Sequence, residues 1–152
     1  MLNLLLVDDE KLYIETIACR LRHRGFSVEC AVSGMEALNR LEKNDTVDVV
    51  FLDVKMPDLD GINTLETLKK KYPLVEVVML TGHATIHSAL KALKFGAYDY
   101  LTKPCDLNAL ISKAKQAASR KKEREAKILS VRMKPYISKR ERDELISNIL
   151  DN

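Results

Sequence analysis

Short apolar runs alternate with segments of helical periodicity along the first 120 residues of the chain. Asn3–Val7 and Val47–Leu52 are apolar without a helical period, and an aspartate follows each of them directly, which is typical of buried strands. Tyr98–Leu101 is shorter, and Lys103-Pro104 follows it after one residue. The pattern predicts five strands, at Asn3–Val7, Phe26–Val32, Val47–Leu52, Val75–Leu80 and Tyr98–Leu101.

The segments between these strands carry apolar residues at helical spacing. Ser33 and Glu36 form a capping box, which predicts a helix start just after Ser33. Helices are expected at Lys11–Arg24, Met35–Lys43, Ile62–Lys71 and Ala84–Lys94, with a fifth after the capping residue Asp106. Five strand–helix units with short connections predict an α/β domain, a parallel sheet with helices on both faces.

The pattern changes beyond residue 120, so we divide the chain into a domain at 1–120 and a basic helical tail at 121–152. The segment 120–127 is nearly all charged, and we expect the fifth helix to pass through it as an exposed extension, leaving the body beyond Ala118. Truncation after Ser119 is then expected to leave the body nearly as stable. Pro135 must interrupt the helix, and a second capping box at Ser138 predicts a last helix to about Leu150.

Two apolar patterns on the tail suggest an interaction element. A weak heptad-like seam runs along the long helix, interrupted in its middle by two charges: Leu110, Ala114, Ala117, Lys121, Arg124, Ile128 and Val131. The last helix carries an apolar patch of Leu145, Ile146, Ile149 and Leu150. We therefore expect the tail to pair two copies of the chain or to dock another protein.

Charge and composition narrow the class of protein. Residues 1–112 hold 13 basic and 16 acidic residues (−3), whereas residues 113–152 hold 12 and 6 (+6), so an acidic body carries a basic tail. No apolar run approaches the roughly 20 residues that cross a bilayer, and acids follow Leu4–Val7 at once, unlike a signal peptide. Three cysteines without paired spacing fit a reducing compartment. We expect a cytoplasmic protein without a membrane partner.

Reactive side chains follow four of the five predicted strands. Open parallel sheets bind ligands at the carboxyl ends of their strands, and here these ends carry Asp8, Asp9, Asp53, Thr81 and Lys103. Clustered carboxylates repel one another, and a Mg²⁺ ion with oxygen ligands relieves that repulsion. A hydroxyl and an ammonium group suit phosphoryl oxygens. A carboxylate can itself attack a phosphoryl group, and Asp53, alone at the end of the middle strand, is the best candidate.

Four sequence pieces, in order and at characteristic spacing, resemble the receiver domain of bacterial two-component response regulators. They are Leu4–Glu10, Val50–Gly61, Val78–Gly82 and Gly96–Pro104, and the resemblance covers about residues 1–120. It implies the flavodoxin-like fold, a doubly wound five-stranded parallel sheet of order 2-1-3-4-5. It also implies a role in two-component phosphorelay signalling.

The resemblance assigns roles to the strand-end residues. Asp53 would be the phosphoacceptor, and Thr81 and Lys103 would hold the phosphoryl oxygens. Asp9 and Asp53 would bind Mg²⁺ directly together with the Lys55 carbonyl. Asp8 would take part in the metal site partly through water.

Three further positions follow from the resemblance. Tyr100 would be the switch aromatic that moves when Thr81 turns to the phosphate, and Lys103-Pro104 would carry a cis peptide bond. Pro57 and Gly61 would shape the loop after the acceptor, and Gly82 would keep the site open. Cys105, a small side chain where the family commonly has a bulky one, is read as a packing residue.

The resemblance also implies partners and leaves alternatives open. The phosphodonor would be a sensor histidine kinase or a histidine phosphotransfer protein, and phosphorylation would switch a surface of the fourth helix, fifth strand and fifth helix for partner binding or homodimerisation. The chain would catalyse only its own phosphorylation and dephosphorylation and would not be an enzyme with an external substrate. One alternative is a DNA-binding regulator acting through the basic tail, which its interleaved acids disfavour. The other is an aspartyl-phosphate hydrolase of the doubly wound class.

Overall fold

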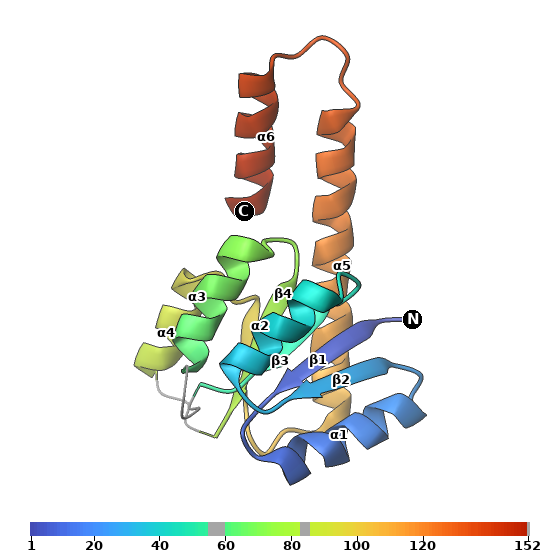
Figure 1. Cartoon of the computed structure of the whole chain (residues 1–152), viewed down its shortest axis with the longest axis vertical. Coiled ribbons are helices and arrows are strands. Elements are labelled where there is room, and N and C mark those ends of the chain that lie inside the picture. Colours follow the sequence, from blue (N-terminus) through green and yellow to red (C-terminus); the bar gives the residue numbers. More distant parts are fainter. Residues whose placement is uncertain (55–59, 83–85, 152) are drawn as a thin grey trace.

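The first 120 residues form a five-stranded parallel sheet with helices on both faces (Figure 1). The computed structural model describes residues 1–54, 60–82 and 86–151. The strand order is β2-β1-β3-β4-β5, which confirms the predicted topology. The strands are β1 (Asn3–Val7), β2 (Ser27–Ala31), β3 (Val49–Leu52), β4 (Glu76–Thr81) and β5 (Asp99–Thr102).

The helices lie close to the predicted ranges, and three of them begin just after the predicted capping residues Ser33, Asp106 and Ser138. Ala84, the predicted start of the fourth helix, lies outside the described residues. Ser33 Oγ accepts a hydrogen bond from the Glu36 amide, which confirms Ser33 as the cap, and the Glu36 carboxylate accepts one from the amide of the preceding residue, Val32. The Asp106 carboxylate caps the fifth helix by accepting from the Asn108 amide. The helices are α1 (Lys11–His23), α2 (Gly34–Lys43), α3 (Gly61–Lys71), α4 (Ile86–Lys94), α5 (Leu107–Arg132) and α6 (Lys139–Asp151).

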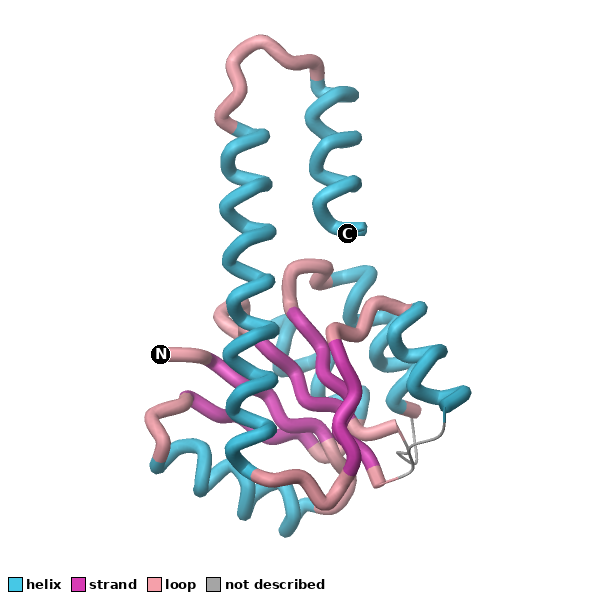
Figure 2. The backbone as a smooth tube through the Cα atoms, turned by 180° about the vertical axis from the view of Figure 1, so that it is seen from behind, coloured by secondary structure: helices cyan, strands magenta, loops and turns pink. Residues whose placement is uncertain are grey.

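Each face of the sheet has its own apolar core. Figure 2 shows α5 and α1 on the near face, where Leu4, Phe51 and Val78 pack against Leu21 of α1 and Leu110 of α5. On the other face, α2, α3 and α4 cover the sheet through Ala37, Leu41, Leu65, Leu68 and Ala92. Alternate residues of the strands point to opposite faces, so the central strands are apolar throughout.

The long helix α5 runs through the predicted charged segment without a break. It ends at Arg132, before Pro135, and α6 returns antiparallel beside its outer half (Figure 1). Ile128 and Val131 of the heptad-like seam are buried, and so is Arg124, one of the two charges that interrupt it, whereas no α6 residue is fully buried. In the apolar patch of α6, Leu145 and Ile149 line a groove with Val131 of α5, whereas Ile146 and Leu150 line a groove with residues of the body such as Leu93.

The expectation that α5 leaves the body beyond Ala118 is wrong. Three later residues of the helix contact the body: Arg120, Lys121 and Arg124. Lys121 Nζ lies 3.0 Å from an Asp48 carboxylate oxygen. Arg120 and Arg124 both reach Glu76, the first residue of β4. Charged side chains rather than apolar ones make these contacts, which is why the apolar pattern misses them.

Glu76 is the centre of a buried ion-pair cluster at the amino ends of the strands. It is 1% exposed, and its carboxylate lies 2.9 Å from Arg124, 3.4 Å from Arg120 and 3.6 Å from Lys69. Arg124 also donates to the carbonyl oxygens of Ile149 and Leu150 near the end of α6. One guanidinium thus ties the sheet, α5 and α6 together. Burial lowers the pKa of Lys69 to about 8, an effect that the Glu76 charge opposes.

Within residues 1–54, 60–82 and 86–151, no helix has both the length and the apolar composition to span a bilayer.

Candidate phosphoacceptor and metal site

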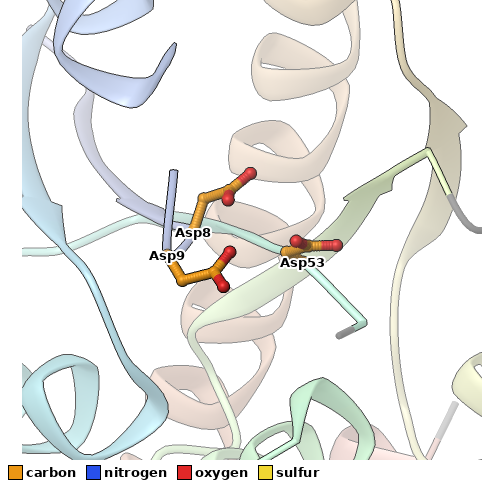
Figure 3. Close-up of side chains that lie close together, drawn as sticks. All are labelled: Asp8, Asp9 and Asp53. Carbon is orange, nitrogen blue, oxygen red and sulfur yellow. The ribbon is translucent and has the colours of Figure 1, made fainter. Parts of the chain in front are cut away.

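Three carboxylates meet at the carboxyl edge of the sheet (Figure 3). Asp8 and Asp9 follow β1 and Asp53 follows β3, and one oxygen from each lies within 4.8 Å of the others. The backbone holds these strand ends in register, because the Asp53 amide donates to Val7 and the Asp8 amide donates to Ala31. The predicted convergence of the two aspartate segments is confirmed.

Asp8 and Asp9 differ in their surroundings. Asp8 is 2% exposed, and its carboxylate accepts hydrogen bonds from the Glu10 amide and from Lys103 Nζ. Asp9 is exposed. Asp9 therefore keeps its oxygens accessible for a metal ion, whereas Asp8 would have to share its carboxylate between the metal and the lysine.

Asp53 is buried but only partly satisfied. It is 3% exposed, and its Oδ2 lies 3.8 Å from Lys103 Nζ. Among the described residues, its buried Oδ1 has no hydrogen-bond partner. A buried carboxylate oxygen without a partner is costly, which makes it a natural ligand or nucleophile.

Lys103 is the cation that faces this acidic cluster. Its ammonium group pairs with Asp8, lies 3.5 Å from Glu10 and sits 4.4 Å from the centre of the Tyr13 ring. Burial lowers the pKa of Lys103, but the hydrogen bond and charge of Asp8 outweigh it and the net shift is upward. The lysine therefore stays charged over the physiological pH range. Its peptide bond to Pro104 is cis, as the resemblance implies.

The two predicted switch residues, Thr81 and Tyr100, lie on the neighbouring strands β4 and β5. Thr81 ends β4 fully buried, and its carbonyl accepts from the Lys103 amide. Tyr100 of β5 is half-buried, and its hydroxyl lies 3.2 Å from Ser88 Oγ on α4. The two predicted switch residues thus belong to adjacent paired strands, and one of them contacts the helix next to the site.

Gly61 shapes the backbone directly behind the acceptor. A Cβ atom at this position would lie 1.9 Å from the Asp53 carbonyl oxygen, and the Gly61 amide donates to the Val54 carbonyl. A side chain at Gly61 would displace the acceptor segment. At Gly82 the nearest atom to a built Cβ is Lys103 Cβ at 3.9 Å, so this position tolerates a small side chain.

The donor set fits Mg²⁺. Three carboxylates supply the hard oxygen ligands that this ion prefers, and one oxygen of Asp53 has no hydrogen-bond partner among the described residues. Lys55 and Pro57 lie outside the described residues.

Comparison with known proteins decides the family. The model of the response regulator receiver domain matches residues 4–115. The chain belongs to this family. Receiver domains take part in two-component signalling, and the fold above is theirs.

Full-length relatives and solved receiver domains agree with this assignment. A putative NtrX-like response regulator of Rickettsia felis is 39% identical over 118 residues, covering 76% of this chain and 25% of that protein. The regulatory protein AtoC of Escherichia coli is 36% identical over 124 residues, covering 80% of this chain and 27% of that protein. The chain thus spans about a quarter of the length of these relatives.

Solved structures of receivers superpose on the body. A receiver domain protein from Clostridium thermocellum is 36% identical, with a TM-score of 0.76, covering 80% of this chain and 98% of its own. NtrX from Brucella abortus in complex with ADP is 34% identical, also with a TM-score of 0.76, and covers 87% of this chain and 30% of its own.

This receiver carries two further residues at its site that the motif reasoning missed. Glu10 and Tyr13 both lie beside Lys103. Tyr13 falls on the first helix, where its sequence context suggests only packing. Burial of Cys105, followed by the Asp106 charge, raises the pKa of its thiol, which supports the reading of Cys105 as a packing residue.

Proposed function

We propose that this receiver accepts a phosphoryl group on Asp53 from a histidine of a sensor kinase or a phosphotransfer protein. The observation that supports this most directly is the buried Asp53 oxygen that has no described partner, beside a lysine and two further carboxylates. An aspartate placed only for stability would have its oxygens satisfied.

The reaction is a displacement at phosphorus. An Asp53 oxygen attacks the phosphorus, the phosphorus–nitrogen bond of phosphohistidine breaks, and the imidazole leaves with the bonding pair. Lys103, 3.8 Å from Asp53, binds a phosphoryl oxygen, and the Thr81 hydroxyl donates to another. Asp8, Asp9 and Asp53, with the Lys55 carbonyl, would hold Mg²⁺, which neutralises charge on the phosphoryl oxygens when bound.

The output is a change of surface on α4, β5 and α5. Thr81 would move toward the phosphate, and Tyr100 would then exchange its contact with Ser88 for the space that Thr81 leaves. The outer side of α4 exposes Ile86 and Leu90, which are 83% and 63% accessible. These apolar side chains support partner binding or homodimerisation through this surface.

We further propose that the chain turns over no external substrate and that the tail does not read DNA by itself. Arg120, Lys121 and Arg124 are already paired with acids of the body, which removes three basic residues from nucleic-acid contact. Relatives named transcriptional regulatory protein, such as ZraR of Escherichia coli, are matched over about a quarter of their length. Tail-mediated dimerisation remains the second route to an output.

Labelling by a small phosphodonor such as acetyl phosphate tests the acceptor. With Mg²⁺ present, we expect one phosphoryl group per chain that base and hydroxylamine remove, absent from Asp53→Asn and retained by Asp45→Asn, whose side chain is exposed. Full labelling of Asp53→Asn would refute the assignment. Continuous release of phosphate from a stable phosphomonoester, in place of a single labelling event, would favour the hydrolase.

A further inference from the structure

A tyrosine ring lies against the lysine of the phosphoacceptor site. The Nζ atom of Lys103 sits 4.4 Å from the centre of the Tyr13 ring, within the range in which an aromatic face attracts a cation. Tyr13 comes from α1 and Lys103 follows β5, so the contact joins two parts of the chain that are 90 residues apart. The lysine side chain is only 13% exposed, which limits screening by water.

The Tyr13 ring packs against the apolar core beneath α1 and α5, and Cys105 packs against the same core. Tyr13 and Cys105 both line a surface groove of about 560 Å³.

The Tyr13 hydroxyl group contributes no negative charge. Burial raises the pKa of Tyr13 more than the neighbouring Lys103 ammonium lowers it. The phenol therefore stays neutral at working pH, and the attraction comes from the ring face. A phenylalanine at this position would keep that attraction.

The other partners of the Lys103 ammonium group among the described residues are carboxylates, and two of them belong to the candidate metal site. Asp8, Glu10 and Asp53 are carboxylates, and Asp8 and Asp53 belong to the cluster that fits Mg²⁺. A divalent cation on these oxygens weakens their attraction for the ammonium and repels it. The Tyr13 ring is the one contact in this set that a cation on the carboxylates leaves intact.

We propose that Tyr13 is a positioning residue for phosphoryl transfer. Its ring keeps the Lys103 ammonium beside Asp53 when Mg²⁺ occupies the carboxylates. The ammonium is then already positioned to bind an oxygen of the incoming phosphoryl group. This role rests on the proposed phosphoacceptor function. Removal of the ring leaves the lysine directed only by carboxylates and solvent, and transfer slows.

Labelling rates with acetyl phosphate at saturating Mg²⁺ test the proposal. Tyr13→Leu should slow labelling about three- to tenfold, the range expected for loss of one partly desolvated cation–π contact. Tyr13→Phe should stay within about twofold of the parent, since the ring face remains. Slowing by Tyr13→Phe as large as that by Tyr13→Leu, or no slowing by Tyr13→Leu, would overturn it.

Tyr98→Leu is a matched control for lost packing. Tyr98 packs against the same apolar core, and its ring lies 5.6 Å from the Arg120 guanidinium, away from the acceptor. Its substitution should lower the free energy of unfolding by an amount similar to Tyr13→Leu while leaving the labelling rate unchanged. Equal slowing by both leucine variants would assign the effect to the core and overturn the proposal.

Proton NMR of the Lys103 side chain separates this proposal from the phosphoacceptor function. A methylene next to an ammonium held over a ring resonates upfield, so the Lys103 ε-protons should move downfield in Tyr13→Leu and stay in Tyr13→Phe. If the parent takes no label, the phosphoacceptor function fails, and the NMR shift still decides whether the ring holds the lysine. An unchanged shift in Tyr13→Leu would overturn the contact itself.

Discussion

Replacing Arg124 by methionine should destabilise both the body and the tail. The substitution keeps a long side chain but removes the 2.9 Å ion pair to Glu76 and the hydrogen bonds to the last turn of α6. Glu76 is 1% exposed, so water cannot replace the lost partner. Lys69 and Arg120 remain at 3.6 Å and 3.4 Å and compensate in part.

The expected loss is about 3 kcal/mol, near the lower end of the cost of removing one partner from a buried ion pair. In a chain of this length that loss corresponds to a fall in the melting temperature of about 6–12 °C. Because the ion pair couples the two residues, Glu76→Met combined with Arg124→Met should cost less than the sum of the single changes. Truncation after Ser119 removes Arg120 and Arg124 together and should destabilise the body at least as much.

Urea unfolding followed by circular dichroism measures these free energies. Lys122→Met is the matched control, since Lys122 lies exposed on the same helix and should change stability by no more than about 0.5 kcal/mol. If Arg124→Met costs no more than Lys122→Met, or if the two single changes add without coupling, the buried cluster does not connect sheet and tail as described.

Two further predictions concern charge. The pKa of Lys69 falls from 10.5 to about 8 on folding, so the unfolded chain binds more protons between these values and the free energy of unfolding should rise with pH across that window. Lys69→Met should abolish the rise and the exposed Lys70→Met should keep it, as pH-dependent urea titrations would show; a parallel pH profile for both contradicts the shift. Calorimetry with Mg²⁺ should find a larger loss of affinity in Asp9→Ala than in Asp8→Ala, because Lys103 pairs with the Asp8 carboxylate; if both variants bind Mg²⁺ as tightly as the parent, the acidic pair is not the metal site.

The strand pattern and strand-end chemistry could be predicted because their signals are local. A strand that is buried on both faces has to be apolar throughout, so runs such as Asn3–Val7 are visible in the sequence and agree with the structure at both ends. Parallel topology then brings the carboxyl ends together, which places Asp8, Asp9 and Asp53 without knowledge of any side-chain contact.

Glu76 and Tyr13 could not be predicted in the same way. Glu76 interrupts an apolar run and reads as the polar edge of a strand, but its burial depends on Arg124, 48 residues later in the sequence. Tyr13 contacts a lysine that is 90 residues away. Both interactions depend on how α5 and α1 cross the sheet, and no periodicity within either segment encodes that crossing.

The second half of α5 shows the limit of apolar patterning most clearly. Arg124 and Lys121 occupy the heptad-like seam, where charges suggest weak packing. In the structure they face buried or half-buried acids, Glu76 and Asp48, so the seam is stabilised by opposite charge where the pattern expects apolar contact. The domain boundary drawn at residue 120 consequently falls inside a helix that contacts the body on both sides of it.

Helix α5 reaches from the acceptor edge of the sheet to the opposite edge, and a buried ion pair anchors it at that opposite edge. Its first turn follows Lys103 at the acceptor edge, and Arg124 is fastened to Glu76 at the opposite edge. The 18 residues from Leu107 to Arg124 span about 26 Å. Because the Arg124–Glu76 ion pair holds the far end of the helix, a displacement of the first turn in either direction, axial or sideways, acts on this ion pair and, through Arg124, on the end of α6.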